Sequence, residues 1–171
     1  MIAVDTNILV YAHLRQSPWY ARAVAVLADL GASGTPWGIP VGCLHEFFSV
    51  VTHPKIYKPA STPAIAIAQV DAWRESPTLT ILAEDAGTWS ILSRLVTEAK
   101  VTGPSVYDAR IAATCLQHGV SELWTSDRDF TRYPSLRVRN PLIAPQPTRA
   151  GEARAAYTIG RRRVTHRATA R

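Results

Sequence analysis

The sequence predicts an α/β fold with a parallel central sheet and helices on both of its faces. Two observations support this prediction. Short apolar runs, of which residues 2–4 are the first, recur along the chain and are typical of buried parallel strands. Segments with helical spacing of apolar residues separate these runs, which is the order of a three-layer α/β domain. The chain has 171 residues, 47% of them hydrophobic, and is long enough to bury one substantial core.

The ends of the predicted elements carry local signals. Pro18 and Pro63 suit the first turn of a helix, where the missing backbone N–H is not needed. Gly31 and Gly119 suit the position at which a helix ends. In chain order we predict a strand at 2–5, helices at 6–14 and 18–31, a strand at 37–39, helices at 41–52 and 63–75, a strand at 78–82, helices at 87–100 and 103–119, a strand at 122–125 and an edge strand at 136–138.

The net charge of +6 is concentrated at the C-terminal end. Residues 1–144 balance 12 Lys and Arg against 12 Asp and Glu, whereas residues 145–171 hold seven arginines and a single acid. The second segment has no apolar periodicity, so we expect a folded domain at 1–144 and a flexible basic tail at 145–171. The body is therefore not a broad basic surface for nucleic acid, although the tail has the charge to bind one.

Location and redox state follow from the same composition. The apolar runs are too short to span a bilayer, and Asp5 interrupts the N-terminal run before it can form a secretory signal. We therefore expect a cytoplasmic protein with no membrane segment. Cys43 and Cys115 have no CxxC spacing and lie among apolar neighbours. They are interpreted as buried free thiols in preference to a disulfide or zinc ligands.

Carboxylates lie where a ligand site is expected. Asp5 follows the first strand, and Asp127 and Asp129 follow the strand at 122–125. In an open parallel sheet these carboxyl ends face the ligand crevice. Glu46 and Asp108 fall on the apolar stripes of two helices, where an isolated carboxylate is costly unless it is paired or binds a metal. Together these positions predict an acidic metal site.

Each acid also has a simpler interpretation. Asp5 suits the N-cap of the first helix, and Asp127 and Asp129 suit a turn. Glu46 would be solvated if the phase of its helix were shifted by one residue.

If the four carboxylates converge, they repel one another, and they must then raise their pKa values or bind a cation. Ligand oxygens of this kind favour Mg²⁺ or Mn²⁺, ions that serve phosphate substrates and activate water for in-line attack.

Other chemistries fit the sequence poorly. There is no GxSxG elbow and no GxxxxGK[ST] phosphate loop. His45 and Glu46 begin an HExxH zinc motif, but Ser49 stands where the second histidine belongs. Asn7 stands where an aspartyl-phosphate phosphatase carries its second acid. The other histidines do not have the spacing of metal ligands; they are His13, His53, His118 and His166.

In its order and spacing of motifs, the sequence resembles PIN-domain ribonucleases, and most closely the VapC toxins of VapBC toxin–antitoxin pairs. The resemblance covers residues 1–142. The matching segments are Ile2-Ala3-Val4-Asp5-Thr6-Asn7, the helix that carries Glu46, Tyr107-Asp108-Ala109-Arg110-Ile111-Ala112-Ala113, Leu123-Trp124-Thr125-Ser126-Asp127-Arg128-Asp129-Phe130 and Leu136-Arg137-Val138-Arg139-Asn140-Pro141-Leu142.

The resemblance implies a PIN-like three-layer fold and a Mg²⁺- or Mn²⁺-dependent endoribonuclease. By position, it makes Asp5 and Asp108 the principal metal ligands, with Glu46 and Asp127 completing the catalytic acidic pocket. The resemblance makes Asp129 an alternate or supporting acid, and the hydroxyls of Thr6 and Thr125 are expected to orient the carboxylates or the bound water.

The resemblance also implies a homodimer that a cognate VapB-type antitoxin holds inactive. The basic tail is not part of the family pattern. We expect this tail to bind RNA through Arg161, Arg162, Arg163 and Arg167. A tail that contacts nothing is equally compatible with the sequence.

Two alternatives to the toxin function have the same fold. One is a housekeeping RNA-processing nuclease, and the other is a non-catalytic binding module, against which the intact acids argue.

Overall fold

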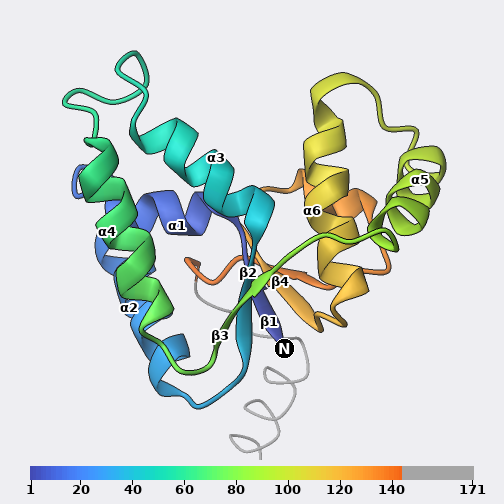
Figure 1. Ribbon diagram of the computed structural model, residues 1–171, viewed down its shortest axis with the longest axis horizontal. Helices are drawn as coiled ribbons and strands as arrows, with labels where there is room; N and C mark the ends of the chain where they lie inside the picture. The colour runs from blue at the N-terminus through green and yellow to red at the C-terminus, as the bar shows by residue number, and fades with distance from the viewer. Residues whose placement is uncertain (144–171) are drawn as a thin grey trace, which may run out of the picture.

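Five parallel strands form one sheet at the centre of the computed structural model, in which residues 1–143 are described (Figure 1). The strands lie in the order β3-β2-β1-β4-β5. Their bounds are β1 Ile2–Val4, β2 Trp37–Pro40, β3 Leu79–Leu82, β4 Glu122–Trp124 and β5 Val138–Arg139. Each neighbouring pair is parallel, so the prediction of a parallel central sheet is confirmed. The expected tail at 145–171 lies outside the described residues.

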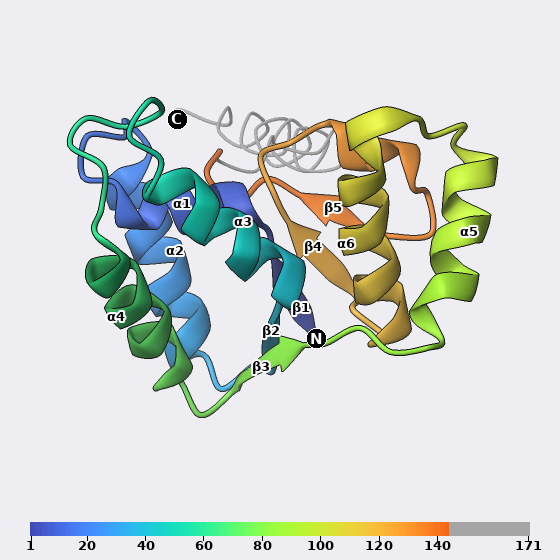
Figure 2. The ribbon, with the colours of Figure 1, turned by 45° about the horizontal axis from the view of Figure 1, so that its top comes forward.

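Helices cover both sides of the sheet. Their bounds are α1 Thr6–His13, α2 Tyr20–Ala32, α3 Val41–Val51, α4 Pro63–Arg74, α5 Thr88–Glu98 and α6 Val106–Gln117. Figures 1 and 2 show α1, α2 and α4 gathered on one side of the sheet and α5 and α6 on the other. Helix α3 contacts α1 and α4 at one end of this arrangement and also reaches α6. Among residues 1–143, no helix combines the length and hydropathy needed to cross a membrane.

Two predicted boundaries shift for local hydrogen-bonding reasons. The last strand begins at Val138 and not at Leu136, because the backbone N–H of Leu136 donates to the carbonyl of Tyr133 in a turn (2.9 Å). The sixth helix begins with a 3₁₀ turn at Gly103–Ser105, and its α-helical part starts at Val106. Asp108 therefore lies in the first turn of α6, closer to the helix start than the sequence indicated.

The core lies between the sheet and its two helical layers. Val4, Ile39, Phe47 and Leu123 have no exposed surface. The two cysteines are buried free thiols, as predicted. Strand β2 has room for nothing larger than glycine at one position, since a Cβ atom on Gly38 would lie 2.8 Å from the Leu82 side chain. Close packing of this kind fixes the sheet on which the site is built.

The carboxyl ends of β1 and β4 lie next to each other in the centre of the sheet. Val4 pairs with Trp124, and the Asp5 N–H donates to the Trp124 carbonyl (3.0 Å). The residues that follow both strands therefore begin from neighbouring points, as the sequence indicated for Asp5 and Asp127. This is the place in an open α/β sheet where a strand-order reversal leaves room for a ligand.

Candidate active site

Asp5 ends β1 and caps α1 with the same carboxylate. Its Oδ1 accepts the Thr6 N–H at 2.7 Å, and its extended backbone is that of an N-cap residue. Its Oδ2 accepts from the Thr125 hydroxyl at 2.6 Å and from the Asn7 side-chain amide at 2.5 Å. The simpler interpretation of Asp5 as a helix cap is thus correct, and the carboxylate also lines the acidic pocket.

The Thr125 hydroxyl joins the loops after β1 and β4. It donates to Asp5, and it accepts from the Asn7 amide (2.8 Å) and from the Asp127 backbone N–H (2.9 Å). Asn7 completes the link, because its Oδ1 accepts the Ser126 N–H at 3.0 Å. One donor and two acceptor positions of the hydroxyl are therefore all used, which holds the Asp5 carboxylate in a single orientation.

Four carboxylates line one open pocket of about 250 Å³. They are the expected acids Asp5, Glu46, Asp108 and Asp127. The pocket is also lined by Thr6, Asn7, Val10, Tyr11, Val50, Tyr57 and Phe130. The acids come from the end of β1, from α3, from α6 and from the loop after β4, so residues more than a hundred positions apart meet at one place. The convergence that the sequence predicted is therefore present in the fold.

Glu46 lies in a different environment from the one its helical spacing indicated. Its side chain is exposed at the edge of the α3 stripe, whereas Cys43 and Phe47 on the same helix are fully buried. Its Oε2 accepts the Thr6 hydroxyl at 2.6 Å. Glu46 is therefore a solvated acid oriented toward the pocket by Thr6, and its placement facing the core was wrong.

Asp129 contacts a pocket residue, Asp127, without lining the pocket itself. Its backbone N–H donates to Asp127 Oδ1 at 2.8 Å, and its own carboxylate lies 3.7 Å from the Arg132 guanidinium. It does not line the pocket with the four acids. Asp129 thus contacts the Asp127 carboxylate through its backbone, and a supporting role for its own side chain stays a prediction.

Burial and mutual repulsion perturb two of the acids. Burial raises the pKa of Asp5 from 3.8 to about 6, and the charge of Glu46 adds to the shift, while the hydrogen bonds from Thr125 and Thr6 oppose it. Burial also raises the pKa of Asp108, and the charges of Asp127 and Glu46 act in the same direction. The charge of Arg132 opposes the shift of Asp108, but none of the described residues that line the pocket is a lysine or an arginine.

The donor set fits a hard divalent cation. Carboxylate oxygens are the ligands that Mg²⁺ and Mn²⁺ prefer, and a bound cation would relieve the repulsion that, after burial, contributes to the raised pKa of Asp108. Within residues 1–143, however, no three His, Cys, Asp or Glu side chains are already close enough to form a preformed metal cluster. The carboxylates would have to draw together around an ion.

Asn7 lines the acidic pocket, although the sequence predicted no role for it. Its position was noted as a departure from a phosphatase loop and as the end of one matching segment of the resemblance. Its amide contacts both Asp5 and Thr125, and the second of these lies 118 residues away in the chain. The available signal was its place two residues beyond a strand-ending acid, at the same sheet edge as the Thr125 loop. The aromatic walls Tyr11, Tyr57 and Phe130 had no comparable signal in the sequence.

Comparison with known proteins agrees with this architecture. A PIN domain family model matches residues 2–136. Ribonuclease VapC48 from Mycobacterium tuberculosis is 30% identical over 142 residues, which cover 81% of this chain and 95% of that protein. Ribonuclease VapC43 from the same species is 32% identical over 142 residues, with coverage of 83% and 96%. The family-model match extends across the strands and helices that supply all four acids.

Solved structures support the fold at lower sequence identity. The crystal structure of VapBC2 from Rickettsia felis, bound to a promoter DNA fragment, gives a TM-score of 0.59 at 23% identity, over 82% of this chain and 98% of that chain. The FitAcB structure from Neisseria gonorrhoeae gives 0.62 at 22% identity, over 84% and 100%. With the family-model match and the relatives above, the fold and the four-acid pocket lead to one assignment: the chain belongs to the PIN domain family, among the VapC ribonucleases.

Proposed function

We propose that this protein is the toxin of a toxin–antitoxin pair, an endoribonuclease that hydrolyses RNA with Mg²⁺ or Mn²⁺ held in the acidic pocket. The observation that carries the proposal is the convergence of Asp5, Glu46, Asp108 and Asp127 on one pocket. The ribonuclease relatives supply the reaction class. A non-catalytic binding module would have no need to keep four mutually repelling acids together, so we disfavour it.

Asp5 and Asp108 are proposed as the principal metal ligands. With a pKa of about 6, Asp5 is mostly ionised at pH 7, by roughly tenfold over its protonated form. Thr125 and Asn7 hold its Oδ2 in place, and Thr6 holds Glu46. The chemistry that Mg²⁺ or Mn²⁺ supplies when bound is polarisation of a phosphoryl oxygen and of the attacking water. Asp127 and Glu46 would complete the oxygen ligands of the ion.

Cleavage of RNA by the purified full-length chain tests this proposal. We expect cleavage in Mg²⁺ or Mn²⁺, loss of cleavage when a chelator removes the metal, and loss in Asp5→Asn and Asp108→Asn with the fold retained by circular dichroism. Asp29→Asn, an exposed acid on α2, is the matched control and should cleave like the wild type. Cleavage at the wild-type rate by either pocket variant would contradict the assigned ligands.

Growth of a bacterial host tests the toxin assignment separately. Solved VapBC and FitAcB structures are the neighbours of this fold, so we propose a VapB-type antitoxin as partner, a homodimer as the toxin's state and the cytoplasm as the place of action. Expression of the wild type alone should arrest growth, and Asp5→Asn at equal protein level should not. If RNA is cleaved in vitro while growth is unaffected, a housekeeping RNA-processing nuclease becomes the better description.

A further inference from the structure

A second pocket adjoins the acidic one and shares Glu46 with it. It has a volume of about 350 Å³ and is lined by Gly42, His45, Glu46, Ser49, Tyr107, Arg110 and Ile111. Helices α3 and α6 form its two sides. Tyr107 directly precedes Asp108 in α6, so the pocket begins beside a proposed metal ligand. A group bound here would lie next to any phosphate held by the acids.

We propose that this pocket binds the base of a nucleotide that flanks the scissile phosphate, and so sets where the RNA is cut. The proposal rests on the ribonuclease function proposed above and assigns a substrate subsite to it. Its volume reaches the lower end of the range for small-ligand pockets, roughly 300–1,000 Å³, which suits one unstacked base. Single-stranded RNA is read mainly through such unstacked bases.

Tyr107 gives the pocket a stacking surface. Its side chain is 63% exposed, although it is large and apolar and lies on a helix that is otherwise well packed. Aromatic rings on nucleic-acid-binding proteins stack on bases because every base has a π face. Gly42 and the buried side chain of Ile111 also line the pocket, so apolar surface accompanies its polar side chains.

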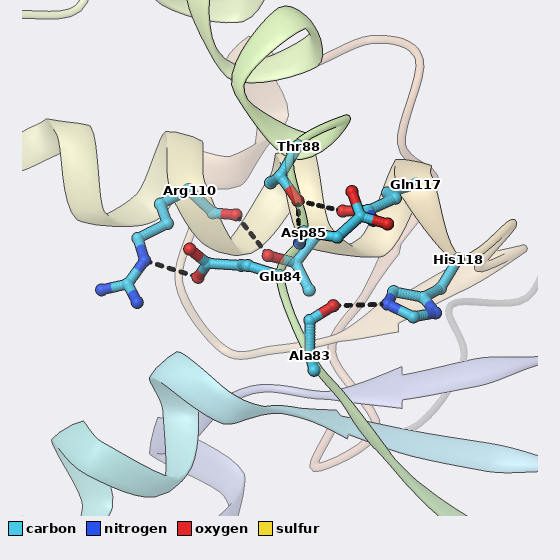
Figure 3. Close-up of polar contacts among 8 residues, drawn as sticks. Ala83, Glu84, Asp85, Thr88, Arg110, Gln117 and His118 are labelled. Carbon is cyan, nitrogen blue, oxygen red and sulfur yellow. Dashed lines mark hydrogen bonds and ion pairs between the residues drawn. The ribbon is translucent and has the colours of Figure 1, made fainter.

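Arg110 is held in place by the loop that follows β3. Its Nε donates to Glu84 Oε1 at 2.5 Å, and in Figure 3 its two terminal nitrogens point away from Glu84. The loop is itself fastened to the end of α6, since His118 Nε2 lies 2.7 Å from the Ala83 carbonyl oxygen and Thr88 contacts the Gln117 side chain (Figure 3). Arg110 is therefore oriented before any ligand arrives.

The charges of the pocket favour a base over a phosphate. Glu84 offsets the charge of Arg110, and Glu46 adds a negative charge, so the site has no net positive charge with which to attract a phosphate. The hydrogen-bond donors left for a ligand include the two terminal amino groups of the Arg110 guanidinium. Paired guanidinium donors match the O6 and N7 acceptors of guanine better than the edge of any other base. Guanine is therefore the base we expect at this position.

The test combines cut-site mapping with kinetics, using the full-length protein and a pool of randomised single-stranded RNA. The wild type should cut with guanine enriched at one fixed position beside the scissile bond. Tyr107→Ala should raise KM by roughly 5- to 150-fold, the range for losing one stacked base, with a smaller change in kcat. Tyr107→Phe keeps the aromatic ring, so its KM should stay close to that of the wild type. Arg110→Lys keeps the charge, loses the paired donors and should weaken the guanine preference.

The control and the binding assay separate this inference from the function on which it rests. Trp89→Ala removes an aromatic side chain on α5 that is 71% exposed, and it should change neither KM nor cut sites. In the Asp5→Asn background, affinity for a labelled guanine-containing oligoribonucleotide should fall when Tyr107→Ala is added. Wild type that fails to cleave RNA overturns the proposed function. Wild type that cleaves, with KM and cut sites unchanged in Tyr107→Ala, overturns the base pocket alone.

Discussion

Replacing Asp5 with asparagine should change how the stability of the metal-free protein depends on pH. Burial raises the pKa of Asp5 from 3.8 to about 6, so the folded protein binds a proton at Asp5 more readily than the unfolded chain does. Stability therefore falls as pH rises through the window between these values. A shift of about 2 units at 1.36 kcal/mol per unit corresponds to roughly 3 kcal/mol when ionisation is complete. About 2 kcal/mol of this should be lost between pH 4 and pH 7.

Asp5→Asn removes this titration while keeping the volume of the side chain. Its Oδ1 still accepts the Thr6 N–H, but an amide at the Oδ2 position faces two donors, from Thr125 and Asn7. That mismatch costs about 1–3 kcal/mol at every pH, so the absolute stability of the variant is a poor test. The pH dependence of the difference between wild type and variant isolates the carboxylate.

Denaturant unfolding in chelator, measured from pH 4 to pH 7, is the assay. The free energy of unfolding of the wild type should fall relative to Asp5→Asn by about 2 kcal/mol across this range. Added Mg²⁺ should stabilise the wild type near pH 7 and have little effect on the variant. Asp29→Asn, on the exposed face of α2, should follow the wild type. Parallel curves for wild type and Asp5→Asn would refute the reasoning, because Asp5 would then carry no buried charge.

Three further changes test other parts of the structure. Thr125→Val removes a buried hydroxyl that hydrogen-bonds to Asp5, Asn7 and Asp127, so it should cost about 2–3 kcal/mol of stability and lower RNA cleavage. Thr131→Val, at an exposed hydroxyl, is its control. Equal effects of the two substitutions would contradict the importance of the Thr125 hydrogen bonds. Gly38→Ala places a Cβ 2.8 Å from Leu82 and should cost about 1–3 kcal/mol in chemical unfolding, whereas Gly31→Ala has space on α2 and should not destabilise. We also propose that deleting residues 145–171 weakens the salt dependence of RNA binding, because the deletion removes Arg161, Arg162, Arg163 and Arg167. The slope of log affinity against log salt concentration should fall in magnitude by about 0.7 for each phosphate that these arginines neutralise, with turnover at saturation preserved. An unchanged slope would leave the tail without a role in RNA binding.

The strands and helices were predictable because their signals are local. The apolar run at Ile2–Val4 could satisfy both faces only inside a parallel sheet, and it forms the central strand. The boundaries were less accessible, since they depend on single hydrogen bonds. The turn at Tyr133 delays β5, and the 3₁₀ turn before Val106 delays α6.

The acids of the site were also predictable, whereas their surroundings were not. Asp5 and Asp127 follow neighbouring strands, so the sheet alone brings them together. Glu46 shares its helical spacing with buried residues, but its carboxylate is exposed, because spacing gives the direction of a side chain and not the depth at which it ends. Asn7 depends on a contact across 118 residues, which no local pattern contains.

The chemistry of the RNA ends tests the central claim most directly. If water attacks phosphorus at the acidic pocket, the ribose 2′-hydroxyl is not the nucleophile, and no histidine is needed as its base. Among residues 1–143, none of those that line the pocket is a histidine, which agrees with this mechanism. Mapping the products of wild-type cleavage in Mg²⁺ should find 5′-phosphate and 3′-hydroxyl ends, and Asp108→Asn should give none. Products that end in 2′,3′-cyclic phosphate would contradict the account.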